Sequence, residues 1–445
     1  MSLAATEFDI PWVDFCGIFE SGAVMQDVSN ERPTWRQALT FWFWLGCVSF
    51  GGPAAQIALM QRELVEKRGW VDRERFQHAL NFCMLLPGPE AMQLATYIGW
   101  SLHGTRGGLA AGALFVLPSA VLLWALSWIY MAGGTLPWIA AAFHGLQPAV
   151  IALIVAAIWR MFFRNVTSHA LRILALTSFL AVFFLKTPFF IVIAAAAGVG
   201  MILGWMNRTD VGLNGQNEPA SDGKLGFAPI ILCVAWWLPV LFAAWLGTWH
   251  GIFAQMGVFF SKVSLLTFGG AYAILPYVSQ TVVADWKWLT ESQMIAGLGL
   301  AETTPGPLIM VLQFVGFAAA WQNPGIMSPL LSGTLGAAMT TWTTFLPAFV
   351  LVLIGAPFME RIRRMAVLRN ALSGISAAVV GVMLNLAVWL GWHIFRPETG
   401  SWDWLTFALS VGFLVLFERG KFSVPFGVLL AGVIGILRWA AWGAA

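Results

Sequence analysis

A glycine and proline break inside an apolar stretch constrains this chain more than any other feature. The sequence SFGGP at residues 49–53 interrupts an apolar run that extends from residue 35 to residue 60. Glycine and proline end one helix there and permit another to begin, which leaves backbone groups without helical partners. A similar sequence, TFGG at residues 267–270, interrupts a second apolar run later in the chain. Within a membrane such a break is tolerated only where it lines a cavity, so we expect both breaks to face one.

The composition of the 445 residues places the chain in a lipid bilayer. Hydrophobic residues make up 59% and charged residues 10%, and the mean hydropathy is +0.77. A soluble globular chain carries about 25% charged residues. Runs of about 20 apolar residues recur from end to end, as in membrane-spanning helices, and the alternating pattern of a β-barrel is absent. The predicted fold class is therefore an all-α polytopic membrane protein.

The remaining composition gives few functional signals. The net charge of +3 is small and indicates no nucleic-acid partner. Four cysteines stand far apart without a CxxC pair, so neither a disulfide framework nor a metal site is predicted, and no cofactor is implied. Residues 1–34 lack the basic start, apolar core and cleavage site of a signal peptide, and we interpret them as a cytoplasmic leader.

The two breaks belong to a repeat that runs through the chain. At a fixed offset of 218, a set of positions meets identical residues: Phe50, Gly51, Gly52, Trp70, Pro87, Gly88 and Pro89 meet Phe268, Gly269, Gly270, Trp288, Pro305, Gly306 and Pro307. After an 11-residue insertion around residues 322–327 the offset becomes 229, where Leu117-Pro118 meets Leu346-Pro347 and Gly145 meets Gly374. We infer a tandem duplication with transporter halves at residues 35–205 and 250–445, a polar linker at 206–226 and a connecting transmembrane helix at 227–249.

The unmatched span determines the predicted topology. Each half holds about six apolar segments, so the extra span inverts the second half, and about 13 segments place the N-terminus in the cytoplasm and the C-terminus in the periplasm. Basic residues of short loops mark the cytoplasmic side: Arg160, Arg164, Arg172, Arg208, Lys224, Arg361, Arg363, Arg364 and Arg369. The basic loop at residues 61–77 is an exception, unless the first two broken segments of each half are re-entrant, which leaves nine crossings. Inverted halves with broken helices are typical of secondary transporters, whose site lies between the halves.

The breaks themselves are the predicted binding site, and helix-end chemistry makes it a site for an anion. A proline at the first position of a half-helix, as at Pro53, Pro89 and Pro307, leaves the N–H groups and the positive dipole end of that turn facing the glycines. Converging half-helix starts would bind a tetrahedral dianion without a buried arginine. The residues expected to take part are Gly51, Gly52, Pro53, Pro87, Gly88, Pro89, Gly269, Gly270, Thr304, Pro305, Gly306 and Pro307. The alternative is that the breaks are kinks that ease helix packing.

Five side chains near the breaks are candidate substrate ligands. Ser49 and Thr267 occupy equivalent positions and can donate hydroxyl hydrogen bonds to an oxyanion, or instead bond a carbonyl of their own helix. Gln56 and Gln93 lie about one turn past the breaks, where an amide donor can reach the substrate. Lys262, roughly 15 Å along its helix, is either a counter-charge or a snorkelling lysine.

Two glutamates beside the breaks are candidates for proton coupling. Glu90 follows Pro89 at the start of a half-helix, where the positive dipole end favours its ionised form. Glu302 precedes Pro305 at the end of a half-helix, where the negative dipole end and the membrane both favour its protonated form. Neither has an acidic counterpart, because Leu308 and Met84 stand at the equivalent positions. Glu302 is therefore the better proton carrier, unless it only bonds a neighbouring helix.

The doubled motifs resemble those of a known family. FGG, a following tryptophan and LPGP in the first half, with FGG, tryptophan and TTPGP in the second, are similar to the signature of the chromate ion transporter family in its two-half form. The resemblance covers about residues 34–439. It implies efflux of chromate across the bacterial inner membrane, driven by a proton gradient or the membrane potential, with chromate resistance as the result and sulfate as a competing ligand. Ala271 departs from the pattern, because proline stands at the equivalent position, Pro53, and predicts a softer break.

Three alternative functions are an enzyme, an anion channel and a transporter of another oxyanion. An enzyme is not predicted, because the motifs GxSxG and HExxH are absent and most histidines lie near expected loops or span ends. An anion channel differs from a carrier in that its flux neither saturates nor runs uphill. A transporter of sulfate or of another tetrahedral oxyanion presents the same ligand chemistry. The sequence leaves open whether the protein forms a homodimer.

Overall fold

The computed structural model describes residues 32–133, 136–206, 226–247, 249–359, 365–396, 402–419 and 423–442, and every regular element in them is a helix. Most of the leader and of the polar linker lie outside the described residues, as do Arg208, Lys224 and the arginines at 361, 363 and 364. The predicted all-helical fold class is confirmed for the part that the structure describes.

The first half and the connecting helix contain nine elements. They are α1 (Trp35–Val48), α2 (Gly52–Gln61), the π-helical turn η2 (Arg62–Lys67), α3 (Arg73–Cys83), α4 (Glu90–Gly133), α5 (Pro137–Asn165), α6 (His169–Leu185), α7 (Phe189–Met206) and the connecting α8 (Ala228–Gly247). Helix α4 is interrupted at His103 and Gly104, where the backbone is not helical. The half-helix that follows the Pro87–Pro89 break is therefore short, and a long helix continues from its end.

The second half repeats this order. Its elements are α9 (Ile252–Leu266), η3 (Ala271–Ala273), α10 (Leu275–Ser279), the π-helical turn η4 (Gln280–Asp285), α11 (Glu291–Thr303), η5 (Leu308–Met310), α12 (Val311–Gln322), α13 (Pro329–Gly355), η6 (Ala356–Phe358), α15 (Ala366–Phe395), α16 (Trp404–Glu418) and α17 (Val424–Trp442).

The repeat extends to backbone details that the sequence alone does not display. Helices α1 and α9 end at equivalent positions, Val48 and Leu266, and the π-helical turns η2 and η4 also occupy equivalent positions. The π-helical segments share only one residue at equivalent positions, Val65 and Val283, since their sequences are RELVEK and QTVVAD. The two halves therefore keep the same backbone path where their side chains have diverged.

Seven helices among the described residues are long and apolar enough to cross a membrane: α4, α5, α7, α8, α13 with η6, α15 and α17. Helices α6 and α16 are apolar but shorter. The broken pair formed by α9 and by residues 271–285 is bent by 119°, and it brings the number to eight if it counts as one span. Because the bend exceeds a right angle, the chain turns back on itself at the second FGG break.

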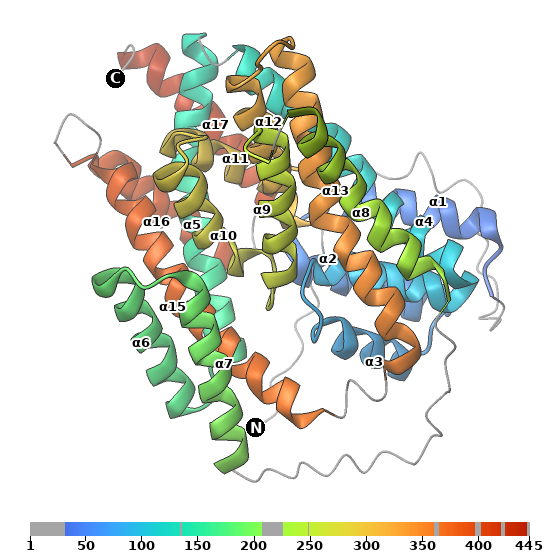
Figure 1. The fold of residues 1–445 in the computed structure, drawn as a ribbon. Coiled ribbons are helices and arrows are strands. Elements are labelled where there is room, and N and C mark those ends of the chain that lie inside the picture. The colour runs from blue at the N-terminus through green and yellow to red at the C-terminus, as the bar shows by residue number, and fades with distance from the viewer. Residues whose placement is uncertain are drawn as a thin grey trace.

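The two halves exchange their terminal helices (Figure 1). Helices α6 and α7 of the first half pack against α15 of the second, and α16 and α17 of the second half pack against α5 of the first. Two glycines allow this close approach, because a Cβ at Gly145 would collide with the carbonyl oxygen of Ala431 and one at Gly374 with that of Ala196. Small residues let membrane helices approach closely, so the last two helices of each half pack tightly against a long helix of the other half.

Candidate functional site

The four breaks meet in two pairs, and each pair joins one half of the chain to the other. The backbone N–H of Gly88 donates to the carbonyl oxygen of Thr267 at 2.7 Å, and the N–H of Gly306 donates to that of Ser49 at 2.7 Å. Both donors lie in a Pro-Gly-Pro break and both acceptors directly precede an FGG break. The structure thus brings together residues that the sequence predicts to share a site.

Glycine is required at these breaks by the backbone conformation. Gly51, Gly52 and Gly88 have φ of 88°, 77° and 127°, and the second-half glycines at 269, 270 and 306 have φ of 77°, 98° and 98°. Residues with a Cβ rarely adopt such angles. The positive φ values reverse the chain between consecutive half-helices.

The prolines begin the half-helices one position away from the predicted register. Helix α2 begins at Gly52 with Pro53 as its second residue, and α4 begins at Glu90, directly after Pro89. In the second half Pro307 precedes the 3₁₀ turn η5, and α12 follows it. At Ala271, where the first half has an α-helix, the chain forms the 3₁₀ turn η3. The absent proline thus accompanies a less regular start, as the sequence suggests.

The N–H groups of the two central glycines are not free to bind an anion in this conformation. Both groups donate to carbonyl oxygens of the opposite half, as a backbone donor at membrane depth must have a partner. The sequence prediction concerns other donors, the N–H groups of the first helical turn after Pro53, Pro89 and Pro307, and it stays a prediction.

The side-chain amides of Gln56 and Gln93 hydrogen-bond backbone carbonyls at the breaks. The Nε2 atom of Gln56 donates to the carbonyl oxygens of Gly306 at 2.6 Å and Ser49 at 3.2 Å. The Nε2 atom of Gln93 donates to the carbonyl oxygen of Pro87 at 2.7 Å. Both side chains are buried, and both Oε1 atoms have no hydrogen-bond partner among the described residues. The amide donors expected for the substrate therefore hold backbone carbonyls here.

The hydroxyl groups at the breaks differ in their partners. Thr267 donates to the carbonyl oxygen of Val263 at 2.7 Å, which is the alternative of a bond to its own helix. Thr304 likewise donates to Ala301 at 3.1 Å. The Oγ atom of Ser49 is buried and has no partner within the described part of the chain. Of the two equivalent hydroxyls, only that of Ser49 remains available.

Ser119 is a residue of the breaks that the sequence analysis missed. It follows Pro118 on α4 and is fully buried, and its Oγ has no partner in the described residues. A Cβ at Gly306 would lie 2.6 Å from the Cβ of Ser119, and a Cβ at Gly88 would lie 3.3 Å from that of Ala348. Ser119 and Ala348 are equivalent positions of the repeat, because each directly follows a Leu-Pro pair. The position of Ser119 directly after the repeated Leu-Pro pair is the sequence signal that could have identified it.

Glu302 is buried at the end of α11 and has a specific partner. The hydroxyl of Tyr272 donates to its Oε1 at 2.5 Å, so Tyr272, whose place beside Gly270 suggests packing alone, is a polar partner as well. The guanidinium of Arg160 on α5 interacts electrostatically with both groups. Glu90 is also buried, at the start of α4, and Arg164 of α5 interacts electrostatically with it. Both arginines are exposed on α5, so these are interactions at a distance and not ion pairs.

Lys262 does not join this buried cluster. It is exposed on α9, whereas its neighbours Ser261 and Val263 are buried. The side chain points out of the helical core, so the structure gives no support to a role as counter-charge and agrees with the snorkelling alternative.

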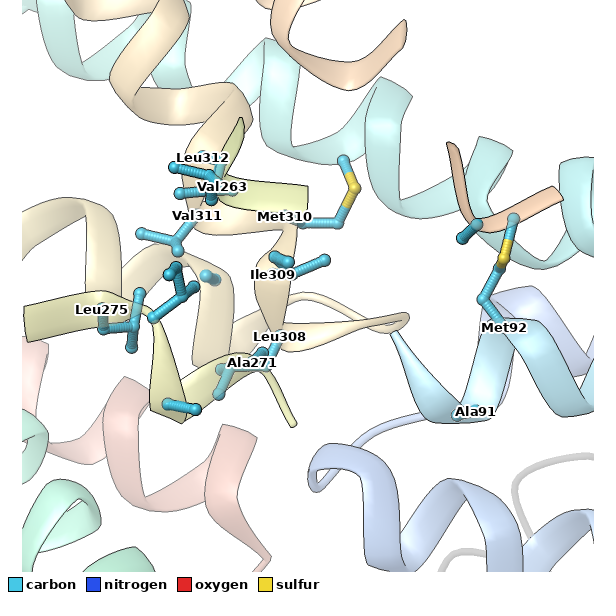
Figure 2. Packing of buried hydrophobic residues seen from close by; sticks show 14 of the residues in the cluster. Ala91, Met92, Val263, Ala271, Leu275, Leu308, Ile309, Met310, Val311 and Leu312 are labelled. Carbon is cyan, nitrogen blue, oxygen red and sulfur yellow. The ribbon is translucent and has the colours of Figure 1, made fainter. Parts of the chain in front are cut away.

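The second-half breaks are surrounded mainly by apolar side chains. Leu308, Ile309 and Met310 of η5 lie beside Ala271 of η3 and Val263 of α9 (Figure 2), and all are buried. This packing holds the two broken pairs of the second half together. The unpartnered oxygen atoms of Ser49, Gln56, Gln93 and Ser119, by contrast, belong to the first half.

A cavity of about 290 Å³ lies apart from the breaks. It is bounded by the end of α4, the start of α5 and the start of α11, and its polar lining includes Tyr130, His144, Gln147, Ser292 and Gln293. Helix α11 connects the two places, because it begins at this cavity and carries Glu302 at its other end.

Comparison with known proteins identifies relatives that match most of the chain. Residues 36–201 and 254–436 match the family described as "Chromate transporter". The chain is 32% identical to the "Chromate transport protein" of Pseudomonas aeruginosa, over 88% of this chain and 89% of that protein. It is 28% identical to the protein of the same description from Cupriavidus metallidurans, over 92% and 95%. No solved structure matches the chain.

Substitution of the central glycines tests the crossed hydrogen bonds. We expect Gly88→Ala and Gly306→Ala to destabilise the purified protein by about 1–3 kcal/mol each, because alanine strains a backbone with positive φ and the new Cβ at 306 meets Ser119. The measurement is the midpoint of thermal unfolding. Gly198→Ala is the control, since a Cβ at Gly198 has no neighbour within 4 Å. Melting of both variants at the wild-type temperature would contradict the role assigned to these bonds.

Proposed function

Because the chain belongs to the chromate transporter family, we propose that it is a secondary transporter that exports chromate across the bacterial inner membrane. The driving force is the proton gradient or the membrane potential, and the consequence for the cell is resistance to chromate. The observation that carries this proposal is the pair of hydrogen bonds that join the breaks of the two halves. Broken helices that meet between repeated halves are the recurrent substrate site of secondary transporters.

We propose that the two halves are inverted and that the protein crosses the membrane nine times. The crossings are α4 after its interruption, α5 to α8, α13 and α15 to α17, and the broken pairs before α4 and α13 are re-entrant. The 119° bend of the second FGG break supports a hairpin, and α1 has only 14 residues, fewer than the roughly 20 that a crossing requires.

The distribution of basic residues favours nine crossings over 13. With nine crossings, the loop at residues 61–77 and Arg106 both lie in the cytoplasm, as the positive-inside rule requires. Most lysines and arginines of the chain then lie on the cytoplasmic side. The five exceptions are Lys186, Lys262, Lys287, Arg396 and Arg438. The N-terminus lies in the cytoplasm and the C-terminus in the periplasm in both arrangements.

The crossed hydrogen bonds suggest how an anion is admitted and released. The N–H groups of Gly88 and Gly306 have carbonyl partners in the present conformation, and a movement of one half against the other would transfer these donors to the oxyanion. The anion thereby replaces the carbonyls of Thr267 and Ser49, and no donor is left unpaired at any stage. In the nine-crossing arrangement the cavity at Tyr130 and Gln293 opens to the periplasm, and it is the exit we propose.

Transport by purified protein in liposomes tests the function. We expect uptake of labelled chromate that saturates and that accumulates chromate above its external concentration when a gradient is imposed. Competition by sulfate at similar concentrations would instead favour the alternative of a general oxyanion transporter. Flux that never saturates and never runs uphill would point to an anion channel. Absence of chromate flux under all of these conditions would refute the proposal.

Glu302 is the residue we propose for proton coupling, with Tyr272 as its positioning partner. We expect Glu302→Gln to retain exchange of chromate across equal concentrations and to lose the response to an imposed pH gradient, because glutamine keeps the polar contact and carries no exchangeable charge. Glu291→Gln at the start of the same helix is the control, and we expect it to respond as the wild type. Undiminished pH-driven accumulation in Glu302→Gln would remove Glu302 from the coupling mechanism and leave Glu90 as the candidate.

Reporter fusions distinguish the two topologies. With nine crossings, a fusion after Lys67 reports the cytoplasm and one after Lys287 reports the periplasm, whereas 13 crossings exchange the two locations. Fusions after Lys224 and Arg369 report the cytoplasm in either case, and a fusion after Ala445 reports the periplasm. If Lys224 and Ala445 were found on the same side, the halves would not be inverted.

A further inference from the structure

Three residues that contact Gly306 each carry a buried oxygen atom that lacks a hydrogen-bond partner among the described residues. These oxygens are the Oγ atoms of Ser49 and Ser119 and the Oε1 atom of Gln56, and the exposed fractions of these side chains are 0%, 0% and 1%. The carbonyl of Ser49 and the amide of Gln56 both bond the backbone of Gly306, and Ser119 packs against its Cα. Buried polar atoms in proteins normally have partners, so this cluster indicates a polar ligand.

The orientation of the Gln56 amide is fixed by its own contacts. Its Nε2 atom faces two carbonyl oxygens, those of Gly306 and Ser49, which only an N–H donor can satisfy. The opposite assignment would place three oxygen acceptors together. The Oε1 atom is therefore the acceptor of this amide and has no partner among the described residues. Ser49 and Ser119, which also contact Gly306, each carry a hydroxyl that can donate.

The equivalent position in the other half lacks this cluster. Around Gly88 the counterparts of Ser49, Gln56 and Ser119 are Thr267, Ile274 and Ala348, and the Thr267 hydroxyl is already bonded to Val263. Gln93 adds an unpartnered Oε1 there, and the buried Oγ1 of Thr344, one turn before Ala348 on α13, also lacks a partner among the described residues. The two breaks thus carry different polar groups, and two serine hydroxyls with a glutamine acceptor occur at Gly306.

A fully deprotonated oxyanion does not match an acceptor at this site. All of its oxygens accept hydrogen bonds, so one of them would face Gln56 Oε1 without a proton between them, at a cost that burial increases. A singly protonated oxyanion donates its O–H to Oε1 and accepts from Ser49 and Ser119. It also carries one negative charge instead of two, and the Born cost of burying a charge grows with its square.

We propose that the cluster of Ser49, Gln56 and Ser119 at Gly306 binds the singly protonated oxyanion, hydrogen chromate, and that this selects chromate over sulfate. The inference rests on the proposed function. Chromate takes up a proton close to neutral pH, whereas sulfate and selenate do so only in strong acid. Shape alone does not distinguish these tetrahedral ions. The bound proton distinguishes them, because only chromate carries one near neutral pH.

Other titratable groups surround the cluster and enter the design of the test. Glu302 lies four residues before Gly306 with Tyr272 as its partner, and the charge of Arg160 on α5 acts on both. The elements around the cluster also carry Arg36 and Cys47 on α1, Glu90, Tyr97, His103, Arg106 and Tyr130 on α4, and Glu291 on α11. Titration of any of these also changes the affinity for anions, and selenate, a tetrahedral anion that stays deprotonated, reports that effect. If selenate does not bind, the pH dependence of the chromate affinity alone is compared with the protonation of chromate.

The test is the affinity of the purified full-length protein for chromate and for selenate as a function of pH. Above the pH at which chromate loses its proton, we expect the ratio of chromate to selenate affinity, in total concentrations, to fall about tenfold per pH unit. A ratio that is independent of pH, in a protein that binds chromate, would overturn the inference and leave the proposed function standing. Absence of chromate binding at every pH would count against both.

Ser119→Ala provides a second measurement with a matched control. We expect it to lower chromate affinity about tenfold or more, because a hydrogen bond to a charged ligand is lost. Ala348→Ser makes the opposite change at the equivalent position, and we expect it to bind chromate as the wild type. Unchanged affinity in Ser119→Ala would place the anion elsewhere. The pH dependence of the wild type decides the question even if the variant does not fold.

Discussion

The structure depends on two backbone hydrogen bonds, from Gly88 to Thr267 and from Gly306 to Ser49. In the apolar part of a membrane a broken helix exposes N–H and C=O groups that neither water nor lipid can satisfy. Here the break of one half is the partner of the break of the other. Neither half therefore completes its own backbone hydrogen bonding alone. The terminal helices also depend on the other half, because α6 and α7 pack against α15, and α16 and α17 pack against α5. The two halves form one interdependent bundle.

The positions of the breaks were predictable because their causes are local. A positive φ requires glycine, and a helix start tolerates proline, so Gly51, Gly88 and Gly306 mark the reversals from sequence alone. The fixed offset of the repeat then indicates that the second set adopts the same backbone. The π-helical turns confirm how far this holds, because they recur at the same offset although five of their six residues differ.

What sequence could not supply is the identity of partners that lie far apart along the chain. Ser119 is one serine in a long apolar helix, and only the approach of Gly306 gives it significance. Tyr272 and Glu302 are 30 residues apart on different half-helices. Lys262 sits at a depth that suits an anion site, but its helix turns it outward. Each of these depends on how helices rotate against one another, which hydropathy does not determine.

Duplication kept the backbone symmetric, whereas the polar side chains diverged. Gln56, Ser119 and Glu302 have Ile274, Ala348 and Met84 as counterparts, so the groups that we propose for substrate binding and proton coupling lie around the break at Gly306. A symmetric backbone suits alternating access, because two conformations related by the repeat differ little in energy. Selectivity requires no symmetry. The driving force requires no symmetry either. The membrane potential supplies about 2.3 kcal/mol per charge for each 100 mV, and it favours the exit of an anion from a negative cytoplasm. We infer that divergence of the side chains served recognition, while the paired breaks preserved the movement.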